Sequence, residues 1–467
     1  MILLNIVLIL GWGRLVSADV HMANGIKIGE VDANSAIIWT RLTAHPERNT
    51  DGHAFTNEKD AARQPIYADL SVMNGSVVGQ SGSVRVTYWP KKQNKFRRST
   101  EWQPVYSEND YTHQFQLKGL RPNTSYQLLV EGRDAESNSQ LHGEFRTAPA
   151  PNQAENIRFV VTTCGDYPRR DDPKNGHKIY PQMLALDPDF FVHTGDIEYY
   201  DKPGPFAKNI ALARFKWNRI FSMPYIRDFH NNVNSYFMKD DHDTVKNDSY
   251  PGQNYFDITW EQGLEIFREQ VPMGETTYRT IRWGKDLQIW LVEGRDFRSP
   301  NNMKDGPDKS IWGAEQKQWF FETVKASDAT FKVLLSPTPI VGPDRAGKND
   351  NHANKGFRHE GDELRRFIAK QGNMTIVCGD RHWQYASIDP KTGVREFSCG
   401  PASDKHAKGY SEKSRNDMHR YLRIQGGFLS VDVDSGIGQI TFRHHSVDGS
   451  VCYEESFKRG KSGHRSK

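Results

Sequence analysis

Several strand-like runs in this sequence end in glycine followed by a residue type that can bind a metal ion or contact a phosphate. Three of them end in Gly165-Asp166, Gly195-Asp196 and Gly379-Asp380. Glycine allows a sharp backbone turn and a close approach to an ion, and aspartate supplies an anionic oxygen. One such pair is an ordinary turn. Three pairs at the ends of separate apolar runs indicate a shared site.

A fourth segment concentrates carboxylates around an imidazole. Residues 239–243 read Lys-Asp-Asp-His-Asp, and Asn247 follows shortly after them. Carboxylates that lie this close raise one another's pKa, so the segment suits a divalent cation. Taken alone, it could equally be a solvated acidic loop. A fifth segment, Asp380-Arg381-His382, carries ligand-type side chains at i and i+2 that could reach two metals.

The N-terminal part of the sequence, which precedes these residues, predicts an all-β domain. Short alternating runs with turn signals between them are typical of a β-sandwich. We expect its strands at 26–31, 35–40, 68–72, 83–88, 112–117, 125–131 and 143–147. An Ala-Pro-Ala-Pro linker at 148–151 follows, so the first domain is predicted to span residues 19–149.

After the linker, expected strands alternate with expected helices, which predicts an α/β domain over residues 152–457. The strands are expected at 157–162, 190–193, 287–292, 332–335 and 374–377, and the helices at 178–186, 315–325 and 362–370. The candidate ligands follow strand ends, where open α/β sheets place their sites. Cys164 also stands at such an end, directly before Gly165.

The chain of 467 residues is long enough for two or three domains, and its formal net charge of +4 does not indicate a stable nucleic-acid complex. An apolar run near the N-terminus, followed by Val16-Ser17-Ala18, predicts a signal peptide over residues 1–18. An uncleaved anchor or a buried strand is the alternative. We therefore expect a secreted, periplasmic or cell-surface protein without a transmembrane span. A basic, disordered tail at 458–467 would allow weak attachment to anionic surfaces.

The four cysteines leave a ligand role and disulfide bonding open. Cys164 is interpreted as a ligand because the other motifs accompany it, although three full pairings are possible among four cysteines. Cys378 is expected in the core, and Cys399 with Cys452 is the pair that would form a disulfide.

The ordered set of motifs resembles the PhoD-like alkaline phosphatase/phosphodiesterase family of the calcineurin-like metallophosphoesterases. The similarity rests on Cys164, on Gly-Asp-Ile-Glu-Tyr at 195–199, on Asp-Asp-His-Asp at 240–243 and on Gly-Asp-Arg-His at 379–382. Segments at 38–42, 146–149 and 294–298 also have counterparts. The resemblance implies a four-layer α/β/β/α metallophosphoesterase sandwich, preceded by an all-β sandwich like a fibronectin or immunoglobulin domain.

The same resemblance implies a metal centre that holds Fe³⁺ and one or two Ca²⁺ ions. Its iron ligands would be Cys164, Asp196, Tyr199 and His382, with Asp196 shared, and its calcium ligands Asp241, Asn247 and Asp380. Asp166 stands where relatives commonly carry glutamine, so it is either an added ligand or an acid behind the ligands. The chemistry agrees with this division, because thiolate, phenolate and imidazole suit a transition metal whereas carboxylate and amide oxygens suit calcium.

The implied activity is hydrolysis of phosphate mono- or diesters by attack of a metal-bound hydroxide at phosphorus. His242 is the candidate for phosphate contact or for protonating the leaving alkoxide, and Arg169 and Arg170 are candidates for binding phosphate oxygens. The substrates would be phosphate-ester small molecules or phosphodiester polymers. Two alternatives stay open: a calcium-dependent surface-binding protein without catalysis, and a phosphodiesterase that acts on phospholipids or nucleic acids.

Overall fold

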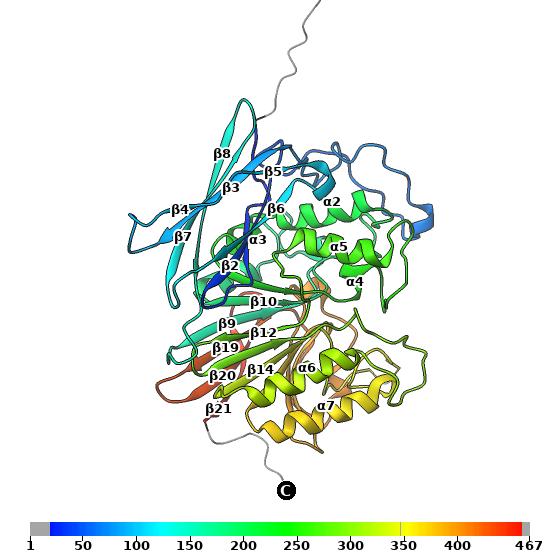
Figure 1. The fold of residues 1–467 in the computed structure, drawn as a ribbon. Helices are drawn as coiled ribbons and strands as arrows, with labels where there is room; N and C mark the ends of the chain where they lie inside the picture. The colour runs from blue at the N-terminus through cyan, green and yellow to red at the C-terminus, as the bar shows by residue number, and fades with distance from the viewer. Residues whose placement is uncertain (1–18, 346, 460–467) are drawn as a thin grey trace, which may run out of the picture.

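The computed structural model describes residues 19–345 and 347–459, and within them the chain forms three β-sheets with helices on two outer faces (Figure 1). The predicted signal peptide, residue 346 and most of the predicted basic tail lie outside the described residues. The first two tail residues belong to the folded chain, because the last strand includes Lys458 and the Arg459 guanidinium lies 2.5 Å from Asp286.

The largest sheet has nine strands and mixes the two halves of the sequence. Its order is β21-β20-β19-β9-β10-β11-β1-β2-β6. The strands are β1 Ile26–Gly29, β2 Ser35–Arg41, β6 Thr112–Lys118, β9 Ile157–Thr162, β10 Phe190–Thr194, β11 Asn234–Met238, β19 Phe428–Asp434, β20 Gln439–His445 and β21 Val451–Lys458. Strands β9, β10 and β11 are parallel and almost entirely buried, which explains the apolar runs 159–161, 190–192 and 236–238 within them.

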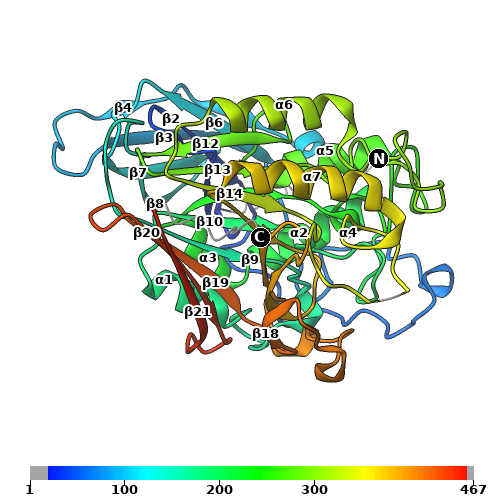
Figure 2. The same ribbon diagram turned by 90° about the horizontal axis from the view of Figure 1, so that it is seen from below.

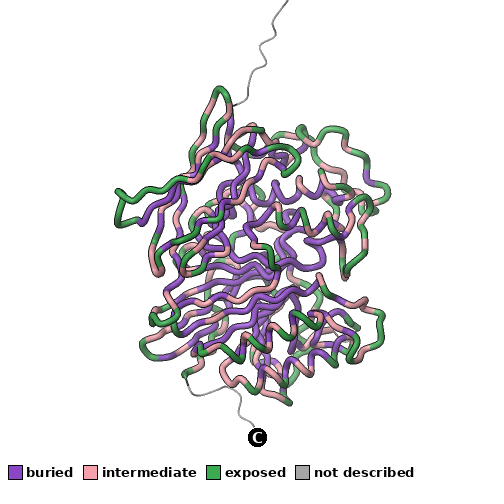
Figure 3. The backbone as a smooth tube through the Cα atoms, in the orientation of Figure 1, coloured by how far each residue is buried: buried purple, intermediate pink, exposed green. Residues whose placement is uncertain are grey.

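A second sheet of seven strands faces the first. Its order is β12-β13-β14-β15-β17-β16-β18. The strands are β12 Arg279–Trp283, β13 Leu287–Leu291, β14 Phe331–Ser336, β15 Met374–Cys378, β16 Gln384–Ile388, β17 Arg395–Cys399 and β18 His419–Arg423. One apolar cluster joins residues of both sheets, among them Phe159 and Val192 from the first and Val333 and Phe397 from the second. The tube representation shows this interior as largely buried (Figure 3).

Helices cover the outer face of each sheet. The helices are α1 Ile179–Ala185, α2 Ile210–Phe221, α3 Pro224–His230, α4 Asp241–Thr244, α5 Trp260–Gln270, α6 Gly313–Ala326 and α7 Arg358–Gln371. One apolar cluster, which includes Phe191 and Phe237, packs α1, α2, α3 and α5 against the nine-stranded sheet. Another, which includes Leu334 and Ile376, packs α6 and α7 against the seven-stranded sheet (Figure 2). The resulting order of layers is helix, sheet, sheet, helix, which confirms the predicted α/β/β/α architecture.

The N-terminal region forms a β-sandwich, and one layer of it is a five-stranded sheet. That sheet consists of β3 Gly82–Pro90, β4 Arg98–Ser99, β5 Gln103–Val105, β7 Ser125–Arg133 and β8 Asn138–Arg146. Its apolar face, with Val84 and Leu128, packs against Ile28 and Ile38 of β1 and β2. The sandwich is joined to the α/β part because β1 pairs in parallel with β11, which leaves neither strand as an open edge.

Most predicted elements lie within one to four residues of those observed, but the strand expected at 68–72 is wrong. Residues 68–72 form bends and turns, and the neighbouring Met73 makes an isolated bridge with His53. The alternation of apolar and polar residues there is too short to form a ladder. Several helices that the sequence interpretation did not include, α2 and α5 above all, pack against the nine-stranded sheet beneath the candidate site.

Candidate metal centre

The candidate ligands meet where strands of both facing sheets end. Cys164 follows β9, Asp196 follows β10, and Asp241 follows β11 of the nine-stranded sheet. Asp380 and His382 follow β15 of the seven-stranded sheet. Strands that are far apart in sequence therefore deliver their polar ends to one place, as expected for the carboxyl edge of an α/β sheet.

The backbone is strained at the candidate ligands. Cys164, Asp166, Asp196 and Asp380 have φ values of 53°, 67°, 59° and 61°. A left-handed conformation is costly for residues with a Cβ and persists only where the surroundings enforce it. Gly195 and Gly379 approach other backbone so closely that an added Cβ would lie 2.9 Å from the Asp240 nitrogen and 2.8 Å from the Pro337 carbonyl oxygen. These turns aim the ligand side chains into the same space.

One group of candidate ligands surrounds Asp196. Its Oδ2 lies 3.7 Å from the Cys164 Sγ and accepts a hydrogen bond of 3.0 Å from the Tyr199 hydroxyl. The Tyr199 hydroxyl lies 3.4 Å from His382 Nε2. Ligand atoms of Cys164, Asp196 and His382 all lie within 4.8 Å of one another. These are the four residues to which the family resemblance assigns the iron site.

A second group shares Asp196 and adds oxygen ligands. Atoms of Asp196, Asp241 and His242 lie within 4.8 Å of one another, and so do atoms of Asp196, Asp240 and Asp380. Asp240 is an addition to the sequence interpretation, which singled out Asp241 from this acidic segment. Because Asp196 belongs to both groups, it is placed to bridge two ions.

The charges of this cluster fit bound cations. Burial and the neighbouring carboxylates of Asp241, Asp240 and Asp243 hold the pKa of Asp196 well above its usual range. The Asp196 Oδ1 and Asp240 Oδ2 atoms are buried and have no hydrogen-bond partner among the described residues. Burying uncompensated anionic oxygens is costly. A multivalent cation would satisfy both atoms and favour the ionised carboxylates.

Cys164 and Tyr199 fit the same interpretation. Burial, together with the charge of Asp196, raises the pKa of the Cys164 thiol and of the Tyr199 phenol well above their ordinary values. Both groups are therefore protonated when no cation is near, and a coordinated metal ion would favour their anionic forms. Neither side chain has solvent access that would stabilise its charge otherwise.

Buried contacts that the sequence did not reveal hold the ligand loops. The Asp243 carboxylate accepts backbone N–H bonds from Asp196 at 2.6 Å, Glu198 at 3.0 Å and Asp240 at 3.1 Å. The Arg295 guanidinium is hydrogen-bonded to Asp240 Oδ1 and lies 3.7 Å from Asp241. Asp243 thus ties the loop after β10 to the loop after β11.

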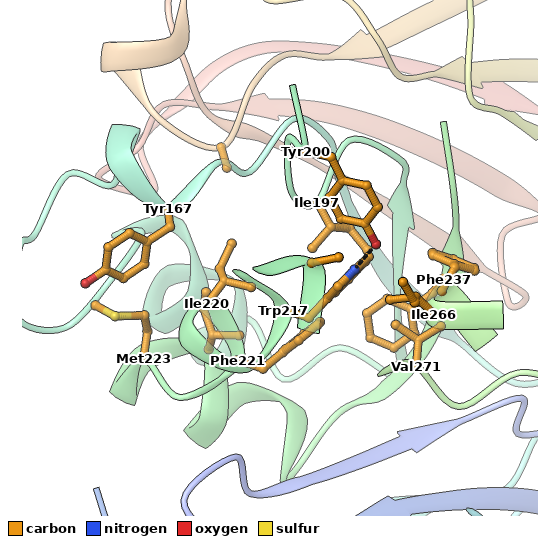
Figure 4. Close-up of a cluster of buried hydrophobic side chains, with 14 of the residues drawn as sticks. Tyr167, Ile197, Tyr200, Trp217, Ile220, Phe221, Met223, Phe237, Ile266 and Val271 are labelled. Atoms are coloured by element: carbon orange, nitrogen blue, oxygen red, sulfur yellow. Dashed lines mark hydrogen bonds between the residues drawn. The ribbon is translucent and has the colours of Figure 1, made fainter. Parts of the chain in front are cut away.

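A second support lies behind the Asp196 loop. Glu198 and Lys216, both fully buried, lie 3.5 Å apart, and Lys216 also donates to the Pro205 carbonyl. Trp217, the next residue of α2, donates a hydrogen bond of 2.6 Å to the Tyr200 hydroxyl within the apolar cluster (Figure 4). The two adjacent tyrosines therefore differ, because Tyr199 faces the ligands and Tyr200 is part of the core.

His242 is oriented by an acid that the sequence interpretation did not select. Its Nδ1 lies 2.6 Å from Asp201 Oδ1. Burial alone would lower the pKa of His242, but the carboxylates of Asp241 and Asp201 outweigh it and raise the pKa above its ordinary value. His242 lines the cavity over the candidate ligands. Asp201 directly follows Tyr200, and its short spacing from Asp196 is the only feature of the sequence that could have pointed to it.

The structure brings some of the remaining predicted residues to this centre and leaves others away from it. Asp166 is buried and forms an ion pair of 3.2 Å with Arg169, and it belongs to none of the ligand groups of the described residues. Arg169 lines the cavity, and so does Asn247, whose amide donates to Asp248. Arg170 is not brought to the cavity, because its guanidinium donates to the Tyr167 and Pro173 carbonyls and stacks on the Tyr167 ring.

The cavity over these residues has a volume of about 320 Å³. Cationic side chains line it beside the acids: Arg169, Lys202, Arg345, Lys348 and Lys408. Partial burial, followed by the charges of Arg169 and Lys202, lowers the pKa of Lys408. A cavity with candidate metal ligands at its base and cations around it is suited to an anionic substrate.

The candidate disulfide between Cys399 and Cys452 is not formed. All four cysteines are free, with Cys164, Cys378 and Cys399 buried and Cys452 exposed. Cys399 ends β17 inside the core between the two sheets, whereas Cys452 lies on the edge strand β21. Cys378 lies in a small buried cluster and 3.3 Å from the Tyr385 hydroxyl, which confirms its core position.

The two facing sheets, with ligand-type side chains at their strand ends, define a metallophosphoesterase. A solved purple acid phosphatase, PPD1 from yellow lupin (Lupinus luteus) seeds, has the same fold, with a TM-score of 0.64 at 13% identity over 93% of this chain and 74% of the lupin chain.

The chain belongs to the PhoD-like phosphatase family. The family model for the PhoD-like phosphatase matches residues 159–449, and the family model for its N-terminal domain matches residues 14–149. Alkaline phosphatase D of Bacillus subtilis (strain 168) is 20% identical over 88% of this chain and 75% of its own length. The solved structure titled "Structure of PhoD" superposes with a TM-score of 0.74 at 16% identity, covering 97% of this chain and 92% of that one. The chain is therefore a hydrolase of the phosphatase type, and its relatives imply dependence on metal ions.

Proposed function

We propose that this protein hydrolyses phosphate mono- and/or diesters at the centre built around Asp196. The observation that carries the proposal is the position of Asp196, whose carboxylate belongs to every candidate ligand group of the described residues. A carboxylate shared by several ligand groups would allow two ions to be held together, and paired ions can stabilise in-line displacement at phosphorus.

We infer that the first group, Cys164, Asp196, Tyr199 and His382, would hold Fe³⁺. The second, Asp241, Asn247 and Asp380 with Asp196, would hold Ca²⁺, and Asp240 is added as a candidate. When bound, the ions would supply Lewis acidity that acidifies water and neutralises charge on the phosphate oxygens. The soft and nitrogen ligands of the first group and the oxygen ligands of the second support this division.

The side chains of the chain itself would bind the ester and move a proton. Arg169, at the cavity wall, can pair with the non-bridging phosphate oxygens, since guanidinium matches phosphate geometry. His242 would donate a hydrogen bond from Nδ1 to Asp201, which leaves its Nε2 to contact a phosphate oxygen or to give a proton to the leaving alkoxide. The raised pKa of His242 supports the proton-donating role.

The division of the chain and its location are part of the same proposal. We assign residues 19–149 to the N-terminal sandwich and 152–457 to the catalytic domain, with a signal peptide at 1–18 and secretion or retention at the cell surface. Among the described residues, no helix combines the length and apolarity needed to cross a membrane. Phosphate-ester small molecules or phosphodiester polymers would be the substrates.

The test uses purified full-length protein loaded with iron and calcium. We expect hydrolysis of p-nitrophenyl phosphate or bis(p-nitrophenyl) phosphate, together with stoichiometric metal by elemental analysis. Asp196→Ala should lose both metals and at least a hundredfold of activity, because it removes the shared ligand. Asp328→Ala, which changes a side chain with 92% of its surface exposed, serves as the control. Equal activity of wild type and Asp196→Ala would overturn the proposal.

A further inference from the structure

The cavity over the metal centre contains more cationic groups than one phosphate requires. Four of its five cations lie within 3.5 Å of an acid: Lys348 of Asp350 at 2.9 Å, Arg169 of Asp166 at 3.2 Å, and Arg345 of Asp344 and Lys202 of Asp201 at 3.5 Å each. Arg169, Lys202 and Lys408 come from separate loops, after β9, β10 and β17. Lys408 is the cation of this cavity without an ion pair among the described residues.

Lys408 forms no ion pair within the part of the chain that the structure describes. Its backbone N–H donates to the His382 carbonyl, which fixes it beside the ligands, but no ion pair, side-chain hydrogen bond or ring contact involves its ammonium group. Lys202 has only a 3.5 Å contact to Asp201, whose oxygens already accept from His242 and from the Asn247 backbone.

Arg169, Lys202 and Lys408 line one cavity, and their like charges repel one another. Holding them together without an anion costs free energy, and such an arrangement is typical of a site that binds an anionic group. Arg169 pairs with Asp166 and lies over the Tyr199 ring, at 5.8 Å from its centroid, so it stays close to the scissile position. Lys202 and Lys408 therefore remain available to bind a second anionic group.

We propose that Lys202 and Lys408 form a second anion-binding subsite, which takes a second phosphate group of the substrate next to the one that is hydrolysed. The inference rests on the proposed function, because it assumes that the ester binds at the Asp196 centre. A cavity of about 320 Å³ is at the small end of ligand pockets and suits one compact anionic chain end. The preferred substrate class is therefore a phosphate ester that carries a neighbouring phosphate.

The neighbouring phosphate could belong to a diester chain or to a phosphoanhydride, and two substrate pairs distinguish them. The first pair is p-nitrophenyl thymidine 5′-phosphate with and without a 3′-phosphate, which share a leaving group and differ only by the second anion. The second is ADP and AMP as competitors of p-nitrophenyl phosphate hydrolysis. All assays use full-length, metal-loaded protein at fixed ionic strength, with metal in excess over nucleotide.

We expect wild type to favour the doubly phosphorylated member of at least one pair about tenfold in kcat/KM or in inhibition constant, the usual value of a charge-assisted hydrogen bond. Lys202→Ala and Lys408→Ala should each lose most of that ratio, and Lys408→Arg should keep it. Lys413→Ala, which removes an exposed charge outside the cavity, is the matched control and should leave the ratio unchanged. Rising salt should shrink the ratio through screening.

The outcomes separate the subsite from the activity itself. A preference in the first pair only identifies a diester chain, a preference in the second only identifies an anhydride, and either supports the subsite when the lysine variants abolish it. If wild type hydrolyses p-nitrophenyl phosphate but shows no preference in either pair, or if the lysine variants keep the ratio, the subsite is refuted while the proposed function stands. Without any hydrolysis by wild type, the proposed function fails first.

Discussion

The Nδ1 atom of His242 lies 2.6 Å from the Oδ1 atom of Asp201. This contact fixes the ring so that its other nitrogen is available to the cavity, and it assigns the hydrogen-bonding proton to Nδ1. Burial would raise the pKa of Asp201, but the hydrogen bond and charge of His242 lower it to about 2. The ionised Asp201 carboxylate therefore orients His242 and favours its protonated form, and Asp201 is a positioning residue for His242.

Asp201→Asn is expected to lower kcat about 10- to 100-fold while the metal content stays unchanged, because Asp201 is not among the candidate ligands and its loss removes the charge partner of His242. Removing the carboxylate should also lower the pKa of His242. If protonated His242 serves the leaving group, the alkaline limb of the pH–rate profile moves to lower pH. Steady-state kinetics with p-nitrophenyl phosphate between pH 5 and 10 measures both effects. An unchanged profile would show that Asp201 does not act through His242.

The two adjacent tyrosines allow a matched test of the proposed iron site. Tyr199→Phe should remove the visible tyrosinate absorption and lower iron content, because the hydroxyl lies among Asp196 and His382. Tyr200→Phe should keep the band, since that hydroxyl accepts from Trp217 in the core, and should cost about 1 kcal/mol of stability. Absorption spectra and metal analysis of both variants are the measurements. Loss of the band in Tyr200→Phe alone would reverse the assignment.

The free cysteines predict a simple thiol count. In the native protein only Cys452 is exposed, so one thiol should react rapidly with Ellman's reagent. Burial raises the pKa of Cys164, Cys378 and Cys399, which suppresses their reactive thiolates further. All four should react after denaturation without reductant. A total of two thiols would instead show that a disulfide forms in the protein.

The sequence revealed the strands and ligands that local pattern encodes, and it missed those that depend on distant pairing. Runs such as 157–162 and 374–377 are apolar and end in Gly-Asp motifs, so their positions could be predicted. The pairing of β1 with β11 joins residues about 200 positions apart, and no local signal announces it. The same holds for Arg295, which reaches Asp240 from another loop. Charge partners from distant loops are invisible until the fold is known.

The buried pair of Glu198 and Lys216 predicts a large stability effect. Lys216→Met should lower the free energy of unfolding by about 3–5 kcal/mol, because it leaves Glu198 charged or forces it to take up a proton in the interior. Adding Glu198→Gln should recover part of the loss. Lys91→Met, at an exposed pair with Glu144, should cost less than about 1 kcal/mol. Urea unfolding of the four proteins gives the comparison. A Lys216→Met variant as stable as Lys91→Met would show that the buried pair contributes nothing.

Glu360 predicts how stability depends on pH at a site away from the metals. Its carboxylate lies 2.9 Å from His352 Nε2 and accepts from Ser310 and from the backbone of Ile311. Burial would raise its pKa, but these contacts lower it to about 2. A carboxylate with a depressed folded-state pKa contributes stability that is fully present above its unfolded pKa of about 4.3 and is lost as the pH falls toward 2.

Glu360→Gln should therefore be less stable than wild type at pH 7, and the difference should shrink as the pH falls from about 4.5 to 2. Glu363→Gln on the same helix is the control, because its carboxylate is 38% exposed and, among the described residues, pairs with Lys317 alone. Its stability curve should run parallel to that of wild type. Urea unfolding at a series of pH values provides the curves. If the two variants show the same pH dependence, the His352–Glu360 contact does not hold the ionised carboxylate, and the depressed pKa of Glu360 would be wrong.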